Sequence, residues 1–349
     1  IGGAQTVGDA AKSGTLTFTG AGTLTSAATL AVPSGVVLSG PLSGAFGLTK
    51  TGTGALTLSG ANTFSGTAAM NAGPVYVGHN SAFGSGTLTM GGAVISSDSA
   101  TPRTVANSFS VTGSRTLGDA TRSGVLTFTG NGALTGATTF TIASDVVMSG
   151  VVSGAFALTK LGTGELTLGG AAPNTYSGAT TVNAGTLTLT GGVAIVDAGA
   201  VTVGASGTLK LASNETIGSL AGAGGVNLQS NTLTVGTATG AYSGVMSGAG
   251  SLVKSGAGIL TLTGVNTFAG GATVNGGTVR VGNDAAFGSG TLVMTSGTVS
   301  SDSGTARTVS NAYAFGGSST LGNATNNGAI TLSGSGNVTA NSTVTVDSA

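Results

Sequence analysis

The chain has no cysteine, no tryptophan and very little charge, since only 6% of its 349 residues are Asp, Glu, Lys or Arg. Without cysteine, neither disulfide bonds nor thiolate-bound metal ions can stabilise the fold. The ten acidic and ten basic side chains balance to a net charge of zero. No basic surface is therefore available to follow a phosphate backbone, which argues against nucleic-acid binding.

Long apolar runs are missing as well. Gly, Ser or Thr interrupts every apolar stretch before it reaches the ~18 residues of a transmembrane helix, so we expect no membrane span in this segment. Disorder is disfavoured because 40% of the residues are hydrophobic. The chain begins with Ile1 and shows no signal peptide, so we expect it to be a fragment of a longer repeat protein.

What the sequence does contain is glycine, at 66 positions, and short runs in which Thr alternates with an apolar residue. Examples are Thr15–Thr19, Ala55–Leu58 and Thr186–Thr190. Alternation with a period of two is typical of half-buried strands, and Thr and Val favour them. Gly-rich turn sequences separate the runs, and no stretch has the period of a helix. The sequence therefore predicts an all-β protein of short strands.

The chain also repeats itself over long distances. The segment "TVGDAAKSGTLTFTG" at residues 6–20 returns as residues 116–130 and again as residues 320–334, with few changes. An offset of 204 residues also carries "AFGSGTLTM" at 82–90 onto "AFGSGTLVM" at 286–294. Repetition at long period is the signature of architectures that stack one unit on the next.

Short strands, Gly-rich corners and long repeats together favour a parallel β-helix, a β-solenoid in which each strand pairs with the strand one turn below. We expect Leu, Val, Ile and Phe to point inward, and Thr, Ser and Ala to point outward. A turn of about 22 residues would give ~16 turns and a rod of roughly 75 Å. We expect residues 1–349 to form one continuous β-solenoid.

Three segments carry a family resemblance. They read "LTKTGTGALTLSGANTFSG", "LTKLGTGELTLGGAAPNTYSG" and "LVKSGAGILTLTGVNTFAGG", and lie in repeat boxes near 48–78, 158–191 and 252–282. These boxes resemble the passenger-associated transport repeat, also called the autotransporter-associated β-strand repeat. The resemblance implies a right-handed parallel β-helix, displayed on or released from the outer surface of a bacterium. Such passengers are normally exported with a C-terminal translocator barrel.

Residues suited to catalysis are few. The one histidine, His79, is replaced by Asn283 in the third repeat, which favours an exposed turn rather than a general base. Asp9 and Asp119 share an equivalent place that Asn323 takes in the third copy. Asn and Asp both form turns, whereas Asn cannot act as a general acid or base. The remaining carboxylates considered, Asp145, Asp197, Glu165 and Glu215, are scattered. We expect no catalytic, cofactor or metal site, no cofactor, and no enzymatic activity.

Several positions recur with the repeat and are predicted to be structural. Lys50, Lys160 and Lys254 precede each Gly-rich corner and are expected to decorate an exposed edge, where lysine discourages strand pairing. Side-chain hydrogen bonds at corners are expected from Asn62, Asn174 and Asn266, and aromatic packing in or near the core from Phe64, Tyr176 and Phe268. Asp98 with Arg103, and Asp302 with Arg307, keep a common spacing and are predicted to form salt bridges.

The function that these features favour is a non-enzymatic extracellular rod with a structural or adhesive role, in a bacterial surface protein or a self-assembling surface fibre. We expect its partners to be further copies, associated end to end or laterally, or a cell surface or matrix. Neither end of the chain shows the polar cap that solenoids need, which favours continuation by repeats or another subunit. Two alternatives remain open: an autotransporter stalk that presents a separate domain, and a solenoid that binds polysaccharide or ice.

Overall fold

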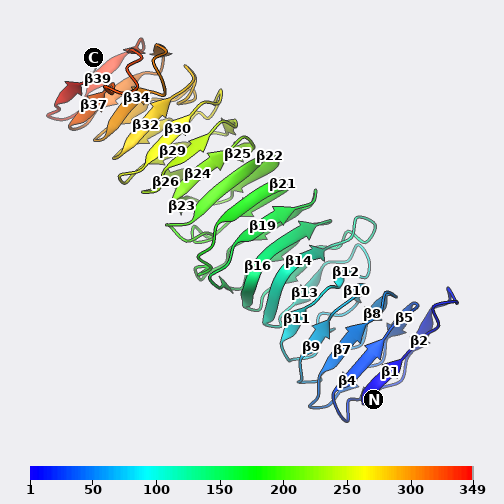
Figure 1. The fold of residues 1–349 in the computed structure, drawn as a ribbon. Coiled ribbons are helices and arrows are strands. Elements are labelled where there is room, and N and C mark those ends of the chain that lie inside the picture. Colours follow the sequence, from blue (N-terminus) through cyan, green and yellow to red (C-terminus); the bar gives the residue numbers. More distant parts are fainter. Residues whose placement is uncertain (348–349) are drawn as a thin grey trace. The chain divides into compact units, whose positions relative to one another are not determined.

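The computed structural model describes residues 1–347 as parallel strands and turns, with no helix among them (Figure 1). The predicted all-β parallel β-solenoid is thereby confirmed. Two compact units divide the chain, Ile1–Ser177 and Gly178–Ala349. Continuity of one solenoid over residues 1–349 stays a prediction, and its last two residues lie outside the described part of the chain.

In the first unit, most strands fall into three stacks of parallel neighbours. The first stack contains β1 (Gly3–Thr6), β4 (Ala28–Ala31), β7 (Leu48–Thr51), β9 (Ala68–Met70), β11 (Leu88–Met90), β14 (Phe109–Leu117), β16 (Gly132–Ile142) and β18 (Val152–Ser153). The second contains β2 (Leu16–Phe18), β5 (Val36–Leu38), β8 (Leu56–Leu58), β10 (Pro74–Val77), β12 (Val94–Ser97), the C-terminal halves of β14 and β16, and β19 (Leu158–Leu161). The third contains β13 (Arg103–Val105), β15 (Leu126–Phe128), β17 (Val146–Met148) and β20 (Glu165–Leu168), and β3 (Gly22–Thr23) pairs with β6 (Leu42–Ser43).

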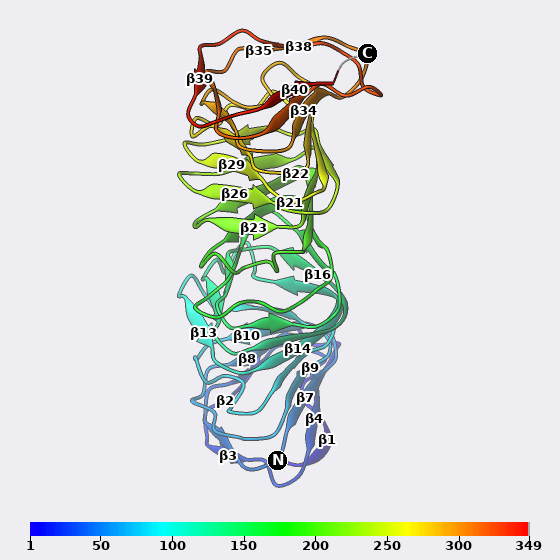
Figure 2. The same cartoon turned by 90° about the vertical axis from the view of Figure 1, so that its left-hand side faces the viewer.

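The second unit is built in the same way, and Figure 2 shows β23, β26 and β29 one above the other. Its longest stack contains β21 (Thr180–Leu189), β22 (Ala200–Leu211), β24 (Ser219–Gly222), β27 (Gly240–Tyr242), β30 (Ile259–Leu262), β32 (Thr278–Val281), β34 (Thr298–Ser301), β37 (Ser319–Leu321) and β40 (Val344–Val346). A second stack contains β23 (Glu215–Ile217), β26 (Thr232–Val235), β29 (Ser251–Lys254), β31 (Ala272–Val274), β33 (Leu292–Met294), β36 (Tyr313–Phe315) and β39 (Gly336–Val338). Shorter pairings join β22, β25 (Gly225–Asn227) and β28 (Met246–Ser247), and β35 (Arg307–Val309) with β38 (Ile330–Leu332).

The length of a coil follows from which residues pair. Leu48 pairs with Ala68 and Ala68 with Leu88, so the plainest coils contain 20 residues, slightly fewer than the expected 22. Phe109 pairs with Gly132, a coil of 23 residues, because a loop at residues 119–124 is inserted there. Loops therefore change the coil length without interrupting the stacking.

Alternation along each strand places apolar side chains inside and Thr or Ser outside, as predicted. β8, for example, buries Leu56 and Leu58 completely and leaves Thr57 half-buried on the outer face. Full burial of a Leu side chain stabilises the fold by about 1.5–3 kcal/mol. Because each coil repeats this pattern over the coil below, the core is a column of aliphatic and aromatic side chains, and stability grows with the number of coils.

Successive copies of the repeat in the first unit do not lie directly above one another. β6 and β18 occupy equivalent places in the two copies, 110 residues apart. Yet the register of pairing puts β18 in the stack of β7, the strand that follows β6. Five coils carry residue 48 to residue 152, which is 104 residues, so the second copy begins one strand position further around the coil. Equivalent side chains of the two copies therefore face different directions.

Candidate functional site

The three recurring lysines lie inside the solenoid, so the prediction that they decorate an exposed edge is wrong. Lys50 and Lys160 are completely buried, and Lys254 is 1% exposed. Each lysine occupies an inward position of a strand, with buried neighbours two residues away along the alternating pattern. The sequence suggested an exposed edge because lysine is almost never buried without a partner.

Backbone carbonyl groups supply the partners of these ammonium groups. Lys254 Nζ donates to the carbonyl oxygens of Gly236 and Gly256, both at 2.9 Å, and Lys50 Nζ donates to those of Gly52 and Ala72 at 3.0 and 2.6 Å. Lys160 Nζ donates to Gly162 at 2.7 Å. The lysine thus satisfies carbonyl oxygens that the Gly-rich corner leaves without strand partners.

Burial changes the acid–base properties of these lysines. It removes water from the ammonium group and lowers the pKa of Lys50 and of Lys160 from 10.5 to about 8, and it also lowers the pKa of Lys254. All three amines therefore still carry a proton at neutral pH. No acidic side chain pairs with Lys50 or Lys254, so both charges are balanced by peptide dipoles alone among the described residues.

The recurring asparagines connect three successive coils. Asn62 Oδ1 accepts the N–H of Leu42 at 2.8 Å, and its Nδ2 donates to the carbonyl of Ala82 at 2.7 Å. Asn266 repeats this arrangement with Met246 and Ala286, at 2.8 and 2.7 Å. Asn174 Oδ1 accepts from Val152 at 2.7 Å. An amide side chain here replaces one rung of the backbone ladder.

The aromatic residues two positions later are in the core, as the sequence predicts. Phe64, Tyr176 and Phe268 are all fully buried. A glycine lies against Phe64 and another against Phe268: a Cβ on Gly84 would approach the ring of Phe64 to 3.0 Å, and one on Gly288 would approach that of Phe268 to 3.1 Å. The corner is therefore a unit of an inward lysine, a bridging asparagine and a buried ring, none of which is open to a ligand.

The histidine and the repeated aspartates form turns. His79 Nδ1 accepts the N–H of Ser81 at 3.0 Å, and Asn283 Oδ1 accepts that of Ala285 at 2.9 Å in the same place of the third repeat. Likewise, Asp9, Asp119 and Asn323 each accept the N–H two residues ahead, at 2.8–2.9 Å. Hydrogen bonds from Thr121 lower the pKa of Asp119, so this carboxylate stays ionised and is unsuited to act as a general acid.

The predicted acid–base pairs lie at the base of two similar loops. Arg103 Nη2 is 2.8 Å from Asp98 Oδ1, and Arg307 Nη2 is 3.0 Å from Asp302 Oδ1. In both loops a serine hydroxyl closes the turn by donating to a threonine carbonyl at 2.7 Å. All four charged side chains are 21–25% exposed, so each pair is expected to contribute about 0–1 kcal/mol and to serve mainly the shape of the loop.

Some structural residues escaped the sequence analysis. Asn107 Nδ2 donates to carbonyls of the coil below, as does Asn311 at the position 204 residues later; the duplication "TVANS" and "TVSNA" was the available signal. Glu215 is 3% exposed and accepts the N–H of Ile195 at 2.8 Å. Burial raises the pKa of Glu215 from 4.5 to about 7. The pattern of the sequence did not single out Glu215 from the other carboxylates.

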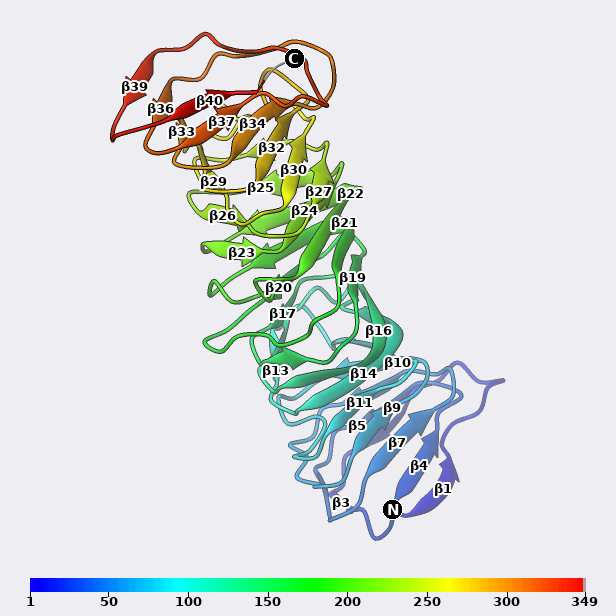
Figure 3. The ribbon, with the colours of Figure 1, turned by 60° about the vertical axis from the view of Figure 1, so that its left-hand side comes forward.

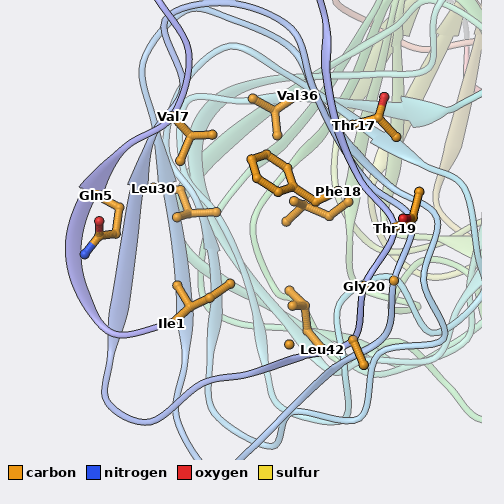
Figure 4. Close-up of a pocket in the computed structure, with 14 residues that line it drawn as sticks. Ile1, Gln5, Val7, Thr17, Phe18, Thr19, Gly20, Leu30, Val36 and Leu42 are labelled. Atoms are coloured by element: carbon orange, nitrogen blue, oxygen red, sulfur yellow. The ribbon is translucent and has the colours of Figure 1, made fainter.

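The roomiest cavity described is the open end of the core at the first coil. It has a volume of about 690 Å³, and Figure 4 shows Ile1, Val7, Phe18, Leu30 and Val36 around it. Its walls are apolar and belong to inward positions of the strands. The cavity contains neither a carboxylate pair nor a histidine among its lining residues.

Chemistry is therefore hard to place on this chain. Within residues 1–347, no group of three or more His, Asp or Glu side chains gathers to hold a metal ion. The Thr pairs do not form a continuous ladder either, because Thr49 is followed by Ala69 and then Thr89 on the next coils of that face. Among the described residues, no helix is long and apolar enough to cross a membrane.

Comparison with known proteins supports the resemblance. The family model of the passenger-associated-transport-repeat matches residues 48–73, 158–189 and 252–281, which confirms the three predicted boxes. A curated relative, the adhesin BmaC autotransporter of Brucella suis biovar 1 (strain 1330), is 44% identical over 245 residues, or 67% of this chain. The chain spans about 7% of the length of that relative. No solved structure matches the chain.

Proposed function

Because this chain is a β-solenoid that carries passenger-associated transport repeats, we propose that it is an adhesive and structural segment of a bacterial surface protein. The observation that carries this proposal is the 44% identity with an autotransporter adhesin, a relative of which the chain matches a small part. An autotransporter passenger is exported, so the proposed location is the outer bacterial surface or the surrounding medium.

The outer surface of the second unit suits adhesion. On the stack from β23 to β39, the paired outward residues are Thr216, Thr234, Val253, Thr273, Val293, Ala314 and Asn337. The charged residues of these strands, Glu215 and Lys254, are buried on the inner side instead. A surface without charge loses little hydration free energy when it contacts another surface, so a broad face of this kind can adhere without a deep pocket.

A non-enzymatic role is part of the proposal. The recurring polar residues are occupied by hydrogen bonds within the solenoid: the lysines bind corner carbonyls, and Asn62 and Asn266 bridge coils. Association of copies, end to end or side by side, is a further part of it. A second candidate role, a stalk that presents another domain, is favoured by the small share of the relative that the chain covers.

Beads coated with the purified chain test adhesion directly. We expect them to adhere to epithelial cell layers or extracellular-matrix proteins more than beads coated with albumin at the same density. A variant with Thr216→Lys, Thr234→Lys and Thr273→Lys adds three charges to one outer face without touching the core, and should reduce adherence. Adherence equal to that of the albumin beads on every surface would contradict the adhesive role.

A further inference from the structure

The first coil presents an unpaired and apolar underside. β2 and β3 pair only with β5 and β6 above them, within the described chain, and their inward side chains face the open cavity (Figure 4). Leu16 is 45% exposed and Phe18 is 48% exposed, although the equivalent Leu126 and Phe128 are completely buried. Unpaired strand edges of this kind are templates for pairing with another chain.

Two other places in the chain show which kind of coil covers this underside. The strand that starts at Leu126 pairs with Arg103–Val105, and Gly132 pairs with Phe109. After an offset of 204 residues the same pairs recur, Ile330 on Arg307 and Gly336 on Tyr313. Leu16 and Gly22 are the counterparts of Leu126 and Gly132, 110 residues earlier. A coil with the arrangement of β13 and β14, or of β35 and β36, therefore matches the register of β2 and β3.

A glycine leaves room for an aromatic ring at this contact. A Cβ on Gly132 would lie 2.2 Å from the ring of Phe109, and one on Gly336 would lie 2.4 Å from that of Tyr313. The first coil carries Gly22 at this place, where a Cβ would meet only the ends of the Leu42 and Ile1 side chains. Phe18 stands at the position of Phe128, whose ring packs edge-on against Phe109 with centroids 5.5 Å apart. The underside is thus shaped for a coil that offers an aromatic residue below Gly22.

We propose that this underside docks on the coil from Thr298 to Phe315 of a second copy, in place of that copy's residues 317–346. This inference rests on the self-association that forms part of the proposed function. Tyr313 of the second copy would lie below Gly22 and beside Phe18, whereas its resident cover has Leu332 at the position of Phe18.

The resident cover is itself weakly buried. It forms the C-terminal end of the second unit, where Figure 3 shows β36, β39 and β40, and Val338 and Val346 are 66% and 70% exposed. Exchange replaces it with a coil of the same register that adds an aromatic contact and buries Leu16 and Phe18. Each docked copy presents its own C-terminal end, so the contact is head to tail and produces open chains rather than closed dimers.

Sedimentation velocity on the full chain tests the exchange. We expect species at multiples of 32.5 kDa whose share grows with concentration. Phe18→Asp places a carboxylate where the docked coil would exclude water, while in the monomer this side chain is already half-exposed. It should raise the concentration needed for association by about tenfold or more. Val265→Asp, at a site that is 55% exposed on the second unit, is the matched control and should associate like the unchanged chain.

A fusion separates this contact from other modes of association. Attaching a copy of residues 94–115 ahead of Ile1 supplies the missing lower coil within one molecule, and should keep the protein monomeric. Monomers of the unchanged chain at every concentration, or association of Phe18→Asp or of the fusion as strong as that of the unchanged chain, would overturn the proposal. Adherence of the monomeric Phe18→Asp protein to cells is measured separately, so loss of the exchange does not imply loss of adhesion.

Discussion

Single residues in this solenoid show that polar side chains are placed inside where the backbone needs partners. A corner rich in glycine turns too tightly to keep its carbonyl groups in the ladder. The ammonium group of Lys50 reaches two such carbonyls, those of Gly52 and Ala72, from an inward position. The lysine is thus a structural substitute for strand pairing rather than a surface charge.

Replacing Lys50 by Met tests this role. The variant keeps the volume of the side chain but leaves the two carbonyl oxygens without their donor, so the free energy of unfolding should fall by about 1–3 kcal/mol. Urea unfolding followed by circular dichroism measures the change. Lys12→Met, at an exposed lysine of the same unit, is the control and should stay within about 0.5 kcal/mol. Equal stability of the two variants would show that the carbonyl contacts are dispensable.

Glu215 predicts a pH dependence of stability for the second unit. Its pKa is raised from 4.5 to about 7, mainly by burial, so the folded state binds the proton more tightly. The stabilisation is complete below about pH 4.5 and is lost as the pH rises through about 7. Hydrogen bonds from Ile195 and Ala194 limit the loss, and the nearby Asp197 increases it.

Glu215→Gln removes this titration. From pH 4.5 to pH 8 the unchanged chain should lose roughly 3 kcal/mol relative to the variant. Unfolding midpoints of both proteins across this range measure the difference, which cancels the contribution of all other groups. A difference that does not vary with pH would mean that Glu215 is ionised throughout, and that the buried carboxylate is fully compensated by its peptide donors.

At the scale of a strand and its corner, the spacing between coils limits which residues fit. Gly224, Gly244 and Gly264 lie above one another in a corner of the second unit. A Cβ on Gly244 would lie within 2 Å of the carbonyl oxygen of Gly224, a contact that only movement of the backbone can relieve. The abundance of glycine therefore reflects close approach of stacked corners, and strands themselves retain Thr, Val and Leu.

Gly244→Ala should consequently lower the free energy of unfolding by about 1–3 kcal/mol, because the coils must separate locally. Thermal unfolding compares it with Gly14→Ala, where a Cβ has no neighbour within 4 Å. The control should change stability by no more than about 0.5 kcal/mol. If both substitutions behave alike, corner packing is looser than the geometry indicates.

At the scale of the whole molecule, each unit stabilises its coils by contact with neighbouring coils, so coils at an open end are the least stable. Hydrogen exchange should show this gradient in the first unit. Amides of β7, β9 and β11, which are covered on both sides, should exchange slowly, and those of β2 and β3 quickly.

The same measurement at rising concentration connects stability with assembly. Docking of a second copy should slow exchange in β2 and β3 and leave β9 unchanged. Uniform exchange rates along the unit at low concentration would contradict the gradient, and would indicate that the first coil is held by contacts other than stacking.

The architecture was predictable because it depends on local patterns repeated many times. Alternation in runs such as Ala55–Leu58 predicts strands, Gly-rich segments predict corners, and the offsets of 110 and 204 residues predict stacking. The three repeat boxes followed from their own letters and were confirmed by the family model. Inward Leu and outward Thr needed no knowledge of the fold beyond the strand period.

Other features were decided only by the tertiary structure. The burial of Lys50, Lys160 and Lys254 depends on where a corner leaves carbonyl groups unpaired, and composition gives lysine to the surface. The shift of β18 into the stack of β7 depends on the summed lengths of loops in intervening coils. Period-two patterns and repeats are local and determine that the chain stacks into a solenoid. Which side chains meet across coils is a property of register, which is set only when all turns close together.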